Sequence, residues 1–286
     1  MFEDLLLNFN DLRDFELYLM RQERAYNTIS KYISDIRSFL AYFKHASLVS
    51  HDMLLDYKNY LQSCDLTPGS INTKLCSINA FLNFKLRPDL KYKLLKIQRS
   101  SFRDDSRNLS KSDFKKLVSC ASSMQNPRLY YLLNILAQTG IRVSELKYID
   151  VSALKSRRVV ISLKSKFRTI FIPSKLAKDL LAYCREYKIK SGPVFVTRTG
   201  TVLSRKQVWH DLKSLAVKAG VLASKVFPHN FRHLFAVLYY NLSNHDIVKL
   251  SDMLGHASIN TTRIYLVTAG SEHVRFLNKL NATLLI

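Results

Sequence analysis

A polar, charged stretch at residues 98–112, QRSSFRDDSRNLSKS, separates two segments of this sequence that are otherwise rich in apolar residues. Weak periodicity and few apolar residues are typical of a linker between separately folded domains. Each flanking segment is long enough to bury a core of its own. We therefore predict a domain at residues 1–98, a basic linker at 99–111 and a second domain at 112–286, whose first helix starts at Ser110 or Ser112.

The positive charge of the chain lies almost entirely after the first domain. The whole chain has 44 Lys/Arg and 22 Asp/Glu, a formal net charge of +22. Residues 1–98 carry 13 basic and 11 acidic side chains, whereas residues 99–286 carry 31 and 11. A basic surface kept only for solubility needs a much smaller excess. The charge instead favours a polyanionic partner, with nucleic acid as the leading class.

Several other classes of protein are not supported. No apolar run approaches the ~20 residues that span a bilayer, and the start of the chain is acidic where a secretory signal is basic. The sequence contains neither of the glycine-rich nucleotide-binding motifs GxxxxGK[ST] and GxGxxG. We expect no membrane association, no cofactor and no metal site. The cysteines lack ligand or disulfide spacing and are expected to be buried or half-buried thiols in a reducing cytosol: Cys64, Cys76, Cys120 and Cys184.

The first domain is predicted to be a compact bundle of four or five helices. Apolar residues at helical spacing, or turn residues at their ends, predict helices near residues 12–19, 29–43, 52–63 and 71–82. Asn27 or Thr28 is a candidate cap for the second helix, and LTPGS at 66–70 predicts a turn before the last one.

The second domain is predicted to be mixed α+β. The segment at 157–172, RRVVISLKSKFRTIFI, alternates around a basic turn and predicts a β-hairpin, and a short strand is expected at 194–196. Helices are expected near residues 112–123, 127–138, 174–187, 205–219, 229–242, 244–254 and 258–267. A final segment at 272–284 has an apolar face.

Four short segments of this domain, called boxes below, carry residues that could take part in chemistry. Two of them have an arginine at a position suited to phosphate binding. In TGIRVSEL (139–146), Gly140 is expected to end a helix in the left-handed conformation and to fix Arg142 at the turn. A guanidinium group binds two phosphate oxygens with its planar fork. In PHNFRHLF (228–235), His229 and Arg232 share one helix face. Taken alone, each arginine is better explained as a surface residue, Arg142 pairing with Glu145 and Arg232 exposed beside a capping His229.

Two further segments carry a possible nucleophile and a possible acid. In LGHASINTTRIY (254–265), Ser258 is a candidate cap that would place Tyr265 two turns into the next helix, with His256 just before it. On the hairpin, Lys164 or Lys166 could protonate a leaving oxygen. Taken alone, Tyr265 is better explained as a core tyrosine and the hairpin lysines as a solvated basic turn.

The order and spacing of these boxes resemble the tyrosine recombinase (phage-integrase) family across essentially the whole chain. The compact size is similar to Xer-type recombinases and transposon-borne resolvases. The resemblance implies a mainly helical protein with a small β-sheet: an N-terminal SAM-like core-binding bundle followed by a mixed α+β catalytic domain. Leu234 and the pair Tyr239-Tyr240 depart from the usual family pattern without removing a catalytic group.

The resemblance also implies a chemistry. Tyr265 would attack a DNA phosphodiester, giving a 3′-phosphotyrosyl link and a free 5′-hydroxyl, without ATP or metal. Arg142 and Arg232 would clamp the phosphate in the transition state, and Glu145 would buttress them. The other assigned roles are Lys164 (alternatively Lys166) as general acid, His229 in proton transfer and His256 as a hydrogen-bond partner of the phosphate.

The same resemblance implies binding partners, an oligomeric state and a location in the cell. We expect a cytoplasmic protein that acts on double-stranded DNA with inverted-repeat sites, as a homotetramer on two sites, with an accessory or partner recombinase as a further candidate partner. The segment after Tyr265, with its apolar face at 274–284, would dock onto a neighbouring subunit or, alternatively, pack onto its own domain. The alternatives are a DNA-binding protein with an inactive site, a relaxing topoisomerase and a membrane-surface binder. The sequence does not distinguish integration, excision, resolution and inversion.

Overall fold

The structure of the protein is a computed structural model that describes residues 4–43, 48–97, 107–163, 166–256, 258–263 and 265. The side chains of residues 162–167 are not described. The chain forms two compact units, Met1–Arg99 and Ser100–Ile286, and each is presented by itself. Both are mainly helical, as predicted, with only short antiparallel strand pairs in the described ranges.

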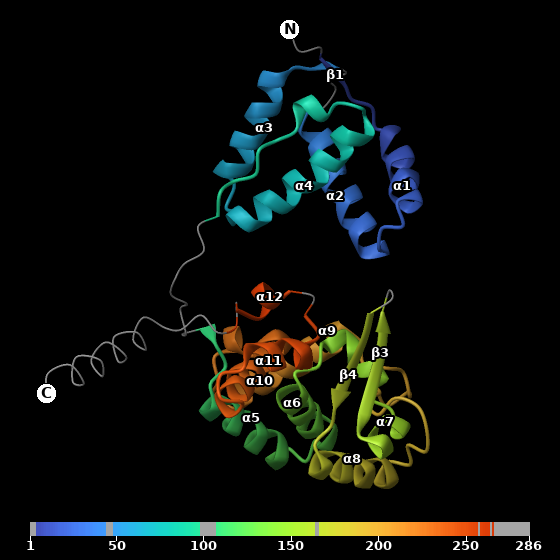
Figure 1. Cartoon of the computed structure of the whole chain (residues 1–286), viewed down its shortest axis with the longest axis vertical. Coiled ribbons are helices and arrows are strands. Elements are labelled where there is room, and N and C mark those ends of the chain that lie inside the picture. The colour runs from blue at the N-terminus through green and yellow to red at the C-terminus, as the bar shows by residue number, and fades with distance from the viewer. Residues whose placement is uncertain are drawn as a thin grey trace, which may run out of the picture. The chain divides into compact units, whose positions relative to one another are not determined.

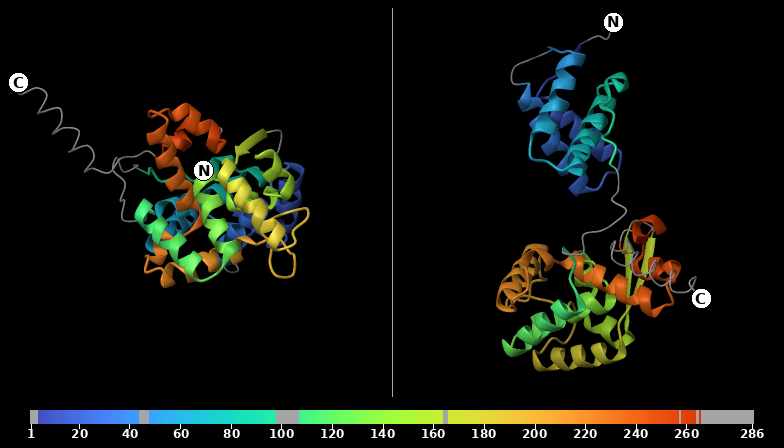
Figure 2. Two further views of the ribbon diagram at one scale, coloured as in Figure 1. Left: turned by 90° about the horizontal axis from the view of Figure 1, so that it is seen from below. Right: turned by 90° about the vertical axis from the view of Figure 1, so that its left-hand side faces the viewer.

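The first unit is a helical bundle (Figures 1 and 2). Its elements are β1 (Leu5–Leu6), α1 (Asp11–Arg21), α2 (Tyr26–Tyr42), β2 (Leu48–Val49), α3 (His51–Ser63), α4 (Pro68–Phe84) and the 3-10 helix η1 (Pro88–Leu90). Helix α4 packs against α1, α2 and α3, and buried aromatic side chains such as Phe15, Phe39 and Phe81 fill the space between them. The two-residue strands β1 and β2 pair antiparallel at the edge of this core.

Side-chain caps explain the starts of two of the four α-helices described in this unit. The Ser50 side chain accepts a hydrogen bond from the Met53 N–H at the start of α3. Thr67 caps α4, and Pro68 occupies its first turn, where no N–H is needed. The predicted cap of α2 at Asn27 or Thr28 is wrong. That helix begins at Tyr26 after an extended Ala25 that makes no side-chain cap.

The second unit is built around α6 (Pro127–Thr139), in which Leu132, Leu133, Ile135 and Leu136 are fully buried. Helices α5 (Lys111–Ser123), α8 (Ser174–Glu186) and α10 (Pro228–Leu242) pack against it (Figure 1). The remaining helices are the 3-10 helix η3 (Val143–Tyr148), α7 (Val151–Ser156), α9 (Arg205–Lys218), the 3-10 helix η4 (Ala223–Lys225), α11 (Ile247–Leu254) and α12 (Ile259–Arg263). Ser110 caps α5 in a reciprocal capping box with Asp113. Of the two predicted helix starts, Ser110 and Ser112, the first is confirmed.

The predicted hairpin is present as β3 (Arg158–Leu163) and β4 (Lys166–Phe171), with Ile161 opposite Arg168. The predicted strand at 194–196 is wrong. Val194 and Phe195 are buried, but this segment makes only isolated bridges, Asp150 to Pro193 and Val196 to Val202. This short apolar run is therefore buried although it does not pair with another strand. Periodicity alone predicts burial but does not show whether a pairing strand is present.

Two further expectations concern cysteines and membranes. Cys184 is buried, and burial raises the pKa of its thiol. Cys64 and Cys120 are half-buried, but Cys76 is exposed on α4, so the prediction of burial is wrong there. Within the described ranges, no helix combines the length and apolar character needed to cross a bilayer.

Candidate active site

Arg142 lies at the turn between α6 and η3. Gly140 ends α6 with φ of 60°, and a Cβ added to it would lie 2.5 Å from the Phe235 ring. Glu145 then binds Arg142 twice: its Oε2 accepts from the Arg142 backbone N–H at 2.9 Å and its Oε1 from Nη1 at 3.0 Å. The Arg142 side chain is 42% exposed and Glu145 only 2%. The buried Glu145 carboxylate thus orients the Arg142 guanidinium, which is still reachable from solvent.

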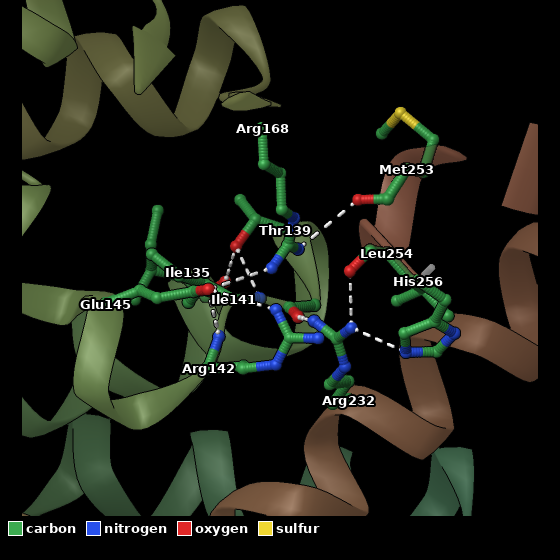
Figure 3. Close-up of polar contacts among 11 residues, drawn as sticks. Ile135, Thr139, Ile141, Arg142, Glu145, Arg168, Arg232, Met253, Leu254 and His256 are labelled. Carbon is green, nitrogen blue, oxygen red and sulfur yellow. Dashed lines mark hydrogen bonds and ion pairs between the residues drawn. The ribbon is translucent and has the colours of Figure 1, made fainter. Parts of the chain in front are cut away.

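Arg232 is a buried residue of α10 that joins segments far apart in the chain (Figure 3). Its Nη1 donates to the Gly140 carbonyl at 2.5 Å, and its Nη2 donates to the Leu254 carbonyl at 2.6 Å. The same Nη2 lies 2.9 Å from His256 Nε2. These bonds tie the ends of α6 and α11 to one guanidinium group.

The hydrogen bonds of His256 determine its tautomer. Arginine has only donors, so His256 Nε2 accepts from Arg232 and the ring proton lies on Nδ1. Nδ1 is 2.8 Å from Thr262 Oγ1 and therefore donates to it. Burial, followed by the positive charge of Arg232, lowers the pKa of the imidazole to about 4, which agrees with this neutral form.

Tyr265 is surrounded by three imidazole rings. The centroid distances are 5.5 Å to His229, 5.6 Å to His233 and 5.7 Å to His256, whose ring is nearly parallel to that of Tyr265. Tyr265 is only 5% exposed. It does not lie two turns into a helix as predicted: α12 ends at Arg263, and Tyr265 sits in the following turn, its N–H bonded to the Thr262 carbonyl.

Arg168, from strand β4, completes the cluster. Its Nη1 donates to both carboxylate oxygens of Glu145, at 3.2 and 2.9 Å, and its Nη2 donates to the Met253 carbonyl at 3.3 Å (Figure 3). Glu145 therefore binds two arginines at once.

The described part of this cluster has an excess of positive charge, because it contains three guanidinium groups and one carboxylate, which pairs with Arg142 and Arg168 but not with Arg232. Burial lowers the pKa of Arg232 to about 10, and the charges of Arg142 and Arg168 add to that shift. Burial also lowers the pKa of Arg168, while Glu145 opposes the change. The arginines stay charged at neutral pH, so the site suits an anion that two or three cations can hold together.

Five of the six sequence-predicted residues meet here. They are Arg142, His229, Arg232, His256 and Tyr265. Lys164 lies outside the described residues, as does the side chain of the alternative, Lys166. Most of the predicted linker and the predicted docking segment after Tyr265 also fall outside them. No three His, Cys, Asp or Glu side chains in the described ranges lie close enough to hold a metal ion.

Two members of the cluster, His233 and Arg168, received no role in the predicted site, although each has an informative spacing to a neighbouring residue. His233 follows His229 by four residues, so both lie on one face of α10. Arg168 shares its face of β4 with Ile170, because side chains two apart in a strand point the same way. The structure shows that this face is the buried one, since both Ile170 and Arg168 are buried.

Comparison with known proteins gives matches over both units. Residues 107–271 match the phage integrase family, and residues 12–88 match the SAM-like N-terminal domain of phage integrases. The tyrosine recombinase XerA of Thermococcus kodakarensis is 31% identical over 275 residues, covering 92% of this chain and 92% of that protein. TnP I resolvase of Bacillus thuringiensis is 26% identical over 277 residues, covering 88% of this chain and 93% of that protein.

A solved structure shares the fold. XerH site-specific recombinase, bound to a palindromic difH substrate in a post-cleavage complex, superposes with a TM-score of 0.66. The two chains are 19% identical, and the match covers 83% of this chain and 75% of that one.

Proposed function

Because the chain belongs to the phage integrase family of tyrosine recombinases, we propose that it recombines DNA at specific sites through a 3′-phosphotyrosyl intermediate on Tyr265. The observation that carries the proposal is the cluster itself: the exposed Arg142 and the buried Arg232 lie in one cluster with Tyr265, whose ring is flanked by three histidines. A scissile phosphate is the anion that such a site would bind and activate.

In the proposed reaction, the Tyr265 oxygen attacks phosphorus and the bond from phosphorus to the 5′-oxygen breaks. His229 assists removal of the phenol proton, and Lys164, or Lys166, gives a proton to the departing oxygen. The pentacoordinate transition state gathers negative charge on the non-bridging oxygens, which Arg142 and Arg232 stabilise. The 5′-hydroxyl of another strand then attacks the phosphotyrosine and reverses the steps. The phosphotyrosyl bond keeps the energy of the phosphodiester, so ATP is not required.

His256 needs a change of tautomer to donate to the phosphate. In the DNA-free site its Nε2 is an acceptor for Arg232, and its proton is on Nδ1. When a phosphate replaces Arg232 as the partner of Nε2, the neutral ring moves its proton to Nε2 and donates to the phosphate, and Nδ1 then accepts from the Thr262 hydroxyl.

The proposal extends to assembly and location. The chain would act in the cytoplasm, as a homotetramer on two inverted-repeat sites, with the segment after Tyr265 exchanged between subunits and an accessory or partner recombinase where the system requires one. Mass photometry of the complex with a two-site DNA tests the stoichiometry. Monomers alone on cleaved DNA would contradict the tetramer.

The decisive experiment traps the covalent intermediate. The protein is incubated with a pool of nicked duplexes made from DNA flanking its gene, and adducts that survive denaturant are isolated and sequenced. The nick lets the short cleaved strand diffuse away, so the phosphotyrosine accumulates. Tyr265→Phe should abolish the adduct, whereas Tyr240→Phe, a matched change at a half-buried tyrosine of the same domain, should retain it.

Three outcomes separate the alternatives. DNA binding without an adduct indicates a binding protein with an inactive site. An adduct together with relaxation of supercoiled plasmids lacking paired sites indicates a topoisomerase. Binding to anionic liposomes without preference for DNA indicates a membrane-surface protein.

A further inference from the structure

We propose that Arg168 is a positioning residue of this active site, which sets the orientation of Arg142 through Glu145 and braces the backbone that carries His256. The inference rests on the proposed function, and it concerns a residue outside the six assigned to the reaction. Arg168 touches neither DNA nor the nucleophile in this scheme; it acts through the groups that do.

The first contact is the shared carboxylate. Glu145 is 2% exposed and accepts from Arg168 at both oxygens and from Arg142 at Oε1 and through the backbone. One negative charge therefore faces two positive charges. Without Arg168, the whole charge of Glu145 would act on Arg142 and hold its guanidinium inward. With Arg168 present, Arg142 remains oriented, but part of its attraction is left for an incoming phosphate.

The second contact is at the end of α11. The Met253 carbonyl accepts from Arg168, and the next carbonyl, Leu254, accepts from Arg232. The last carbonyls of a helix have no partner within it, and its C-terminus favours cations. Two guanidinium groups thus hold consecutive carbonyls immediately before Gly255 and His256.

Gly255 shows how closely Arg168 approaches this turn. It has φ of 60° and caps α11, and a Cβ added to it would collide with the aliphatic part of the Arg168 side chain. The stem of Arg168 therefore lies directly against the backbone next to His256. A shift of this stem would move the imidazole, which is otherwise held by Arg232 and Thr262.

The burial of Arg168 supports a role for its charge. The residue is 9% exposed, and within the described part of the chain its Nε is a buried donor without a hydrogen-bond partner. Burying a cation and leaving a donor unsatisfied both cost stability, and an apolar side chain at this place in the sheet would avoid that cost. The site keeps the guanidinium, which matches a need for its fork at Glu145 and Met253.

The experiment compares two substrates that differ in charge at the scissile position. One has an ordinary phosphate and the other a neutral methylphosphonate, which lowers the need for an arginine clamp. Arg168→Met removes the charge, Arg168→Lys keeps it without the fork, and Arg158→Met is the control on an exposed arginine of the same hairpin. The rate of adduct formation and the DNA dissociation constant are measured for each variant.

We expect Arg168→Met to slow adduct formation on the phosphate by about tenfold or more, with DNA affinity nearly unchanged. On the methylphosphonate the loss should shrink, as it should for Arg142→Met. Arg168→Lys should fall between wild type and Arg168→Met, and Arg158→Met should match wild type.

Other results overturn the proposal. If Arg168→Met lowers the rate of adduct formation equally on both substrates, Arg168 only supports the fold. If Arg168→Met forms the adduct on the phosphate substrate at the wild-type rate, Arg168 has no role in the reaction. If Arg168→Met does not fold, Arg168→Lys decides by the same two comparisons. Failure of the wild-type protein to form any Tyr265 adduct refutes the proposed function instead, and is seen before any variant is tested.

Discussion

Gly140→Ala is expected to destabilise the second unit by two separable contributions. Gly140 has φ of 60°, a conformation that costs a residue with a Cβ about 1–2 kcal/mol. The new Cβ would also lie 2.5 Å from the Phe235 ring, and overpacking of this kind costs about 1–3 kcal/mol. The sum is a loss of about 2–5 kcal/mol in the free energy of unfolding.

A second glycine separates the two contributions. Gly220 has φ of 63°, but nothing lies within 4 Å of its added Cβ, so Gly220→Ala should lose only the conformational part. Urea unfolding followed by tryptophan fluorescence gives both values. The chain has a single tryptophan, Trp209 on α9, so the signal reports the second unit alone.

The substitution also reaches the site, because the Gly140 carbonyl accepts from Arg232. We expect Gly140→Ala to slow adduct formation and Gly220→Ala to leave it unchanged. Adding Phe235→Leu removes ring atoms that the Cβ would meet, so the double variant should lose less than the sum of the single losses. Equal stabilities of the two alanine variants, or strict additivity with Phe235→Leu, would refute the reasoning.

Three further predictions concern charge. Glu145→Ala leaves Arg168 buried without its counter-ion, so the free energy of unfolding measured in urea should fall by about 3–5 kcal/mol. An unchanged free energy of unfolding would contradict the pairing of Arg168 with Glu145. In DNA-free protein the NMR titration of His256 should have its midpoint near pH 4, and Arg232→Met should raise it; a midpoint near the ordinary 6.5 would contradict the geometry. Because the unfolded chain takes up this proton first, the stabilising contribution of neutral His256 is complete above pH 6.5 and is lost as pH falls toward 4. In a filter-binding series, the logarithm of the DNA association constant should fall linearly with the logarithm of salt concentration, with a slope of about −0.9 per neutralised phosphate. An affinity insensitive to salt would rule out the electrostatic basis for binding.

Local patterns predicted most of the helices and the hairpin correctly. Apolar periodicity, Ser110 and the alternating run at 157–172 each depend on neighbours within a few residues, so the sequence displays them directly. The conformation of Gly140 was predictable for the same reason, since a glycine after an apolar helix is a common C-cap.

The rest depends on contacts between distant segments. The bond from Arg232 to the Gly140 carbonyl spans 92 residues, and no periodicity encodes it. The segment at 194–196 has the composition of a strand but no long neighbour to pair with, and Tyr265 lies past the end of α12. The family resemblance indicated which residues would meet, while the second partner of Glu145, Arg168, came only from the three-dimensional arrangement.

The closure of the cluster around Arg232 has a consequence for synthesis on the ribosome. Arg232 binds one carbonyl 92 residues earlier and another 22 residues later, and the nucleophile proposed here comes later still. Translation proceeds from the N-terminus, so a nascent chain exposes its basic segments long before Leu254 and Tyr265 leave the exit tunnel. In the proposed reaction, a growing or prematurely terminated chain carries basic segments but lacks the nucleophile, and the cluster closes only when translation has passed the last of these residues.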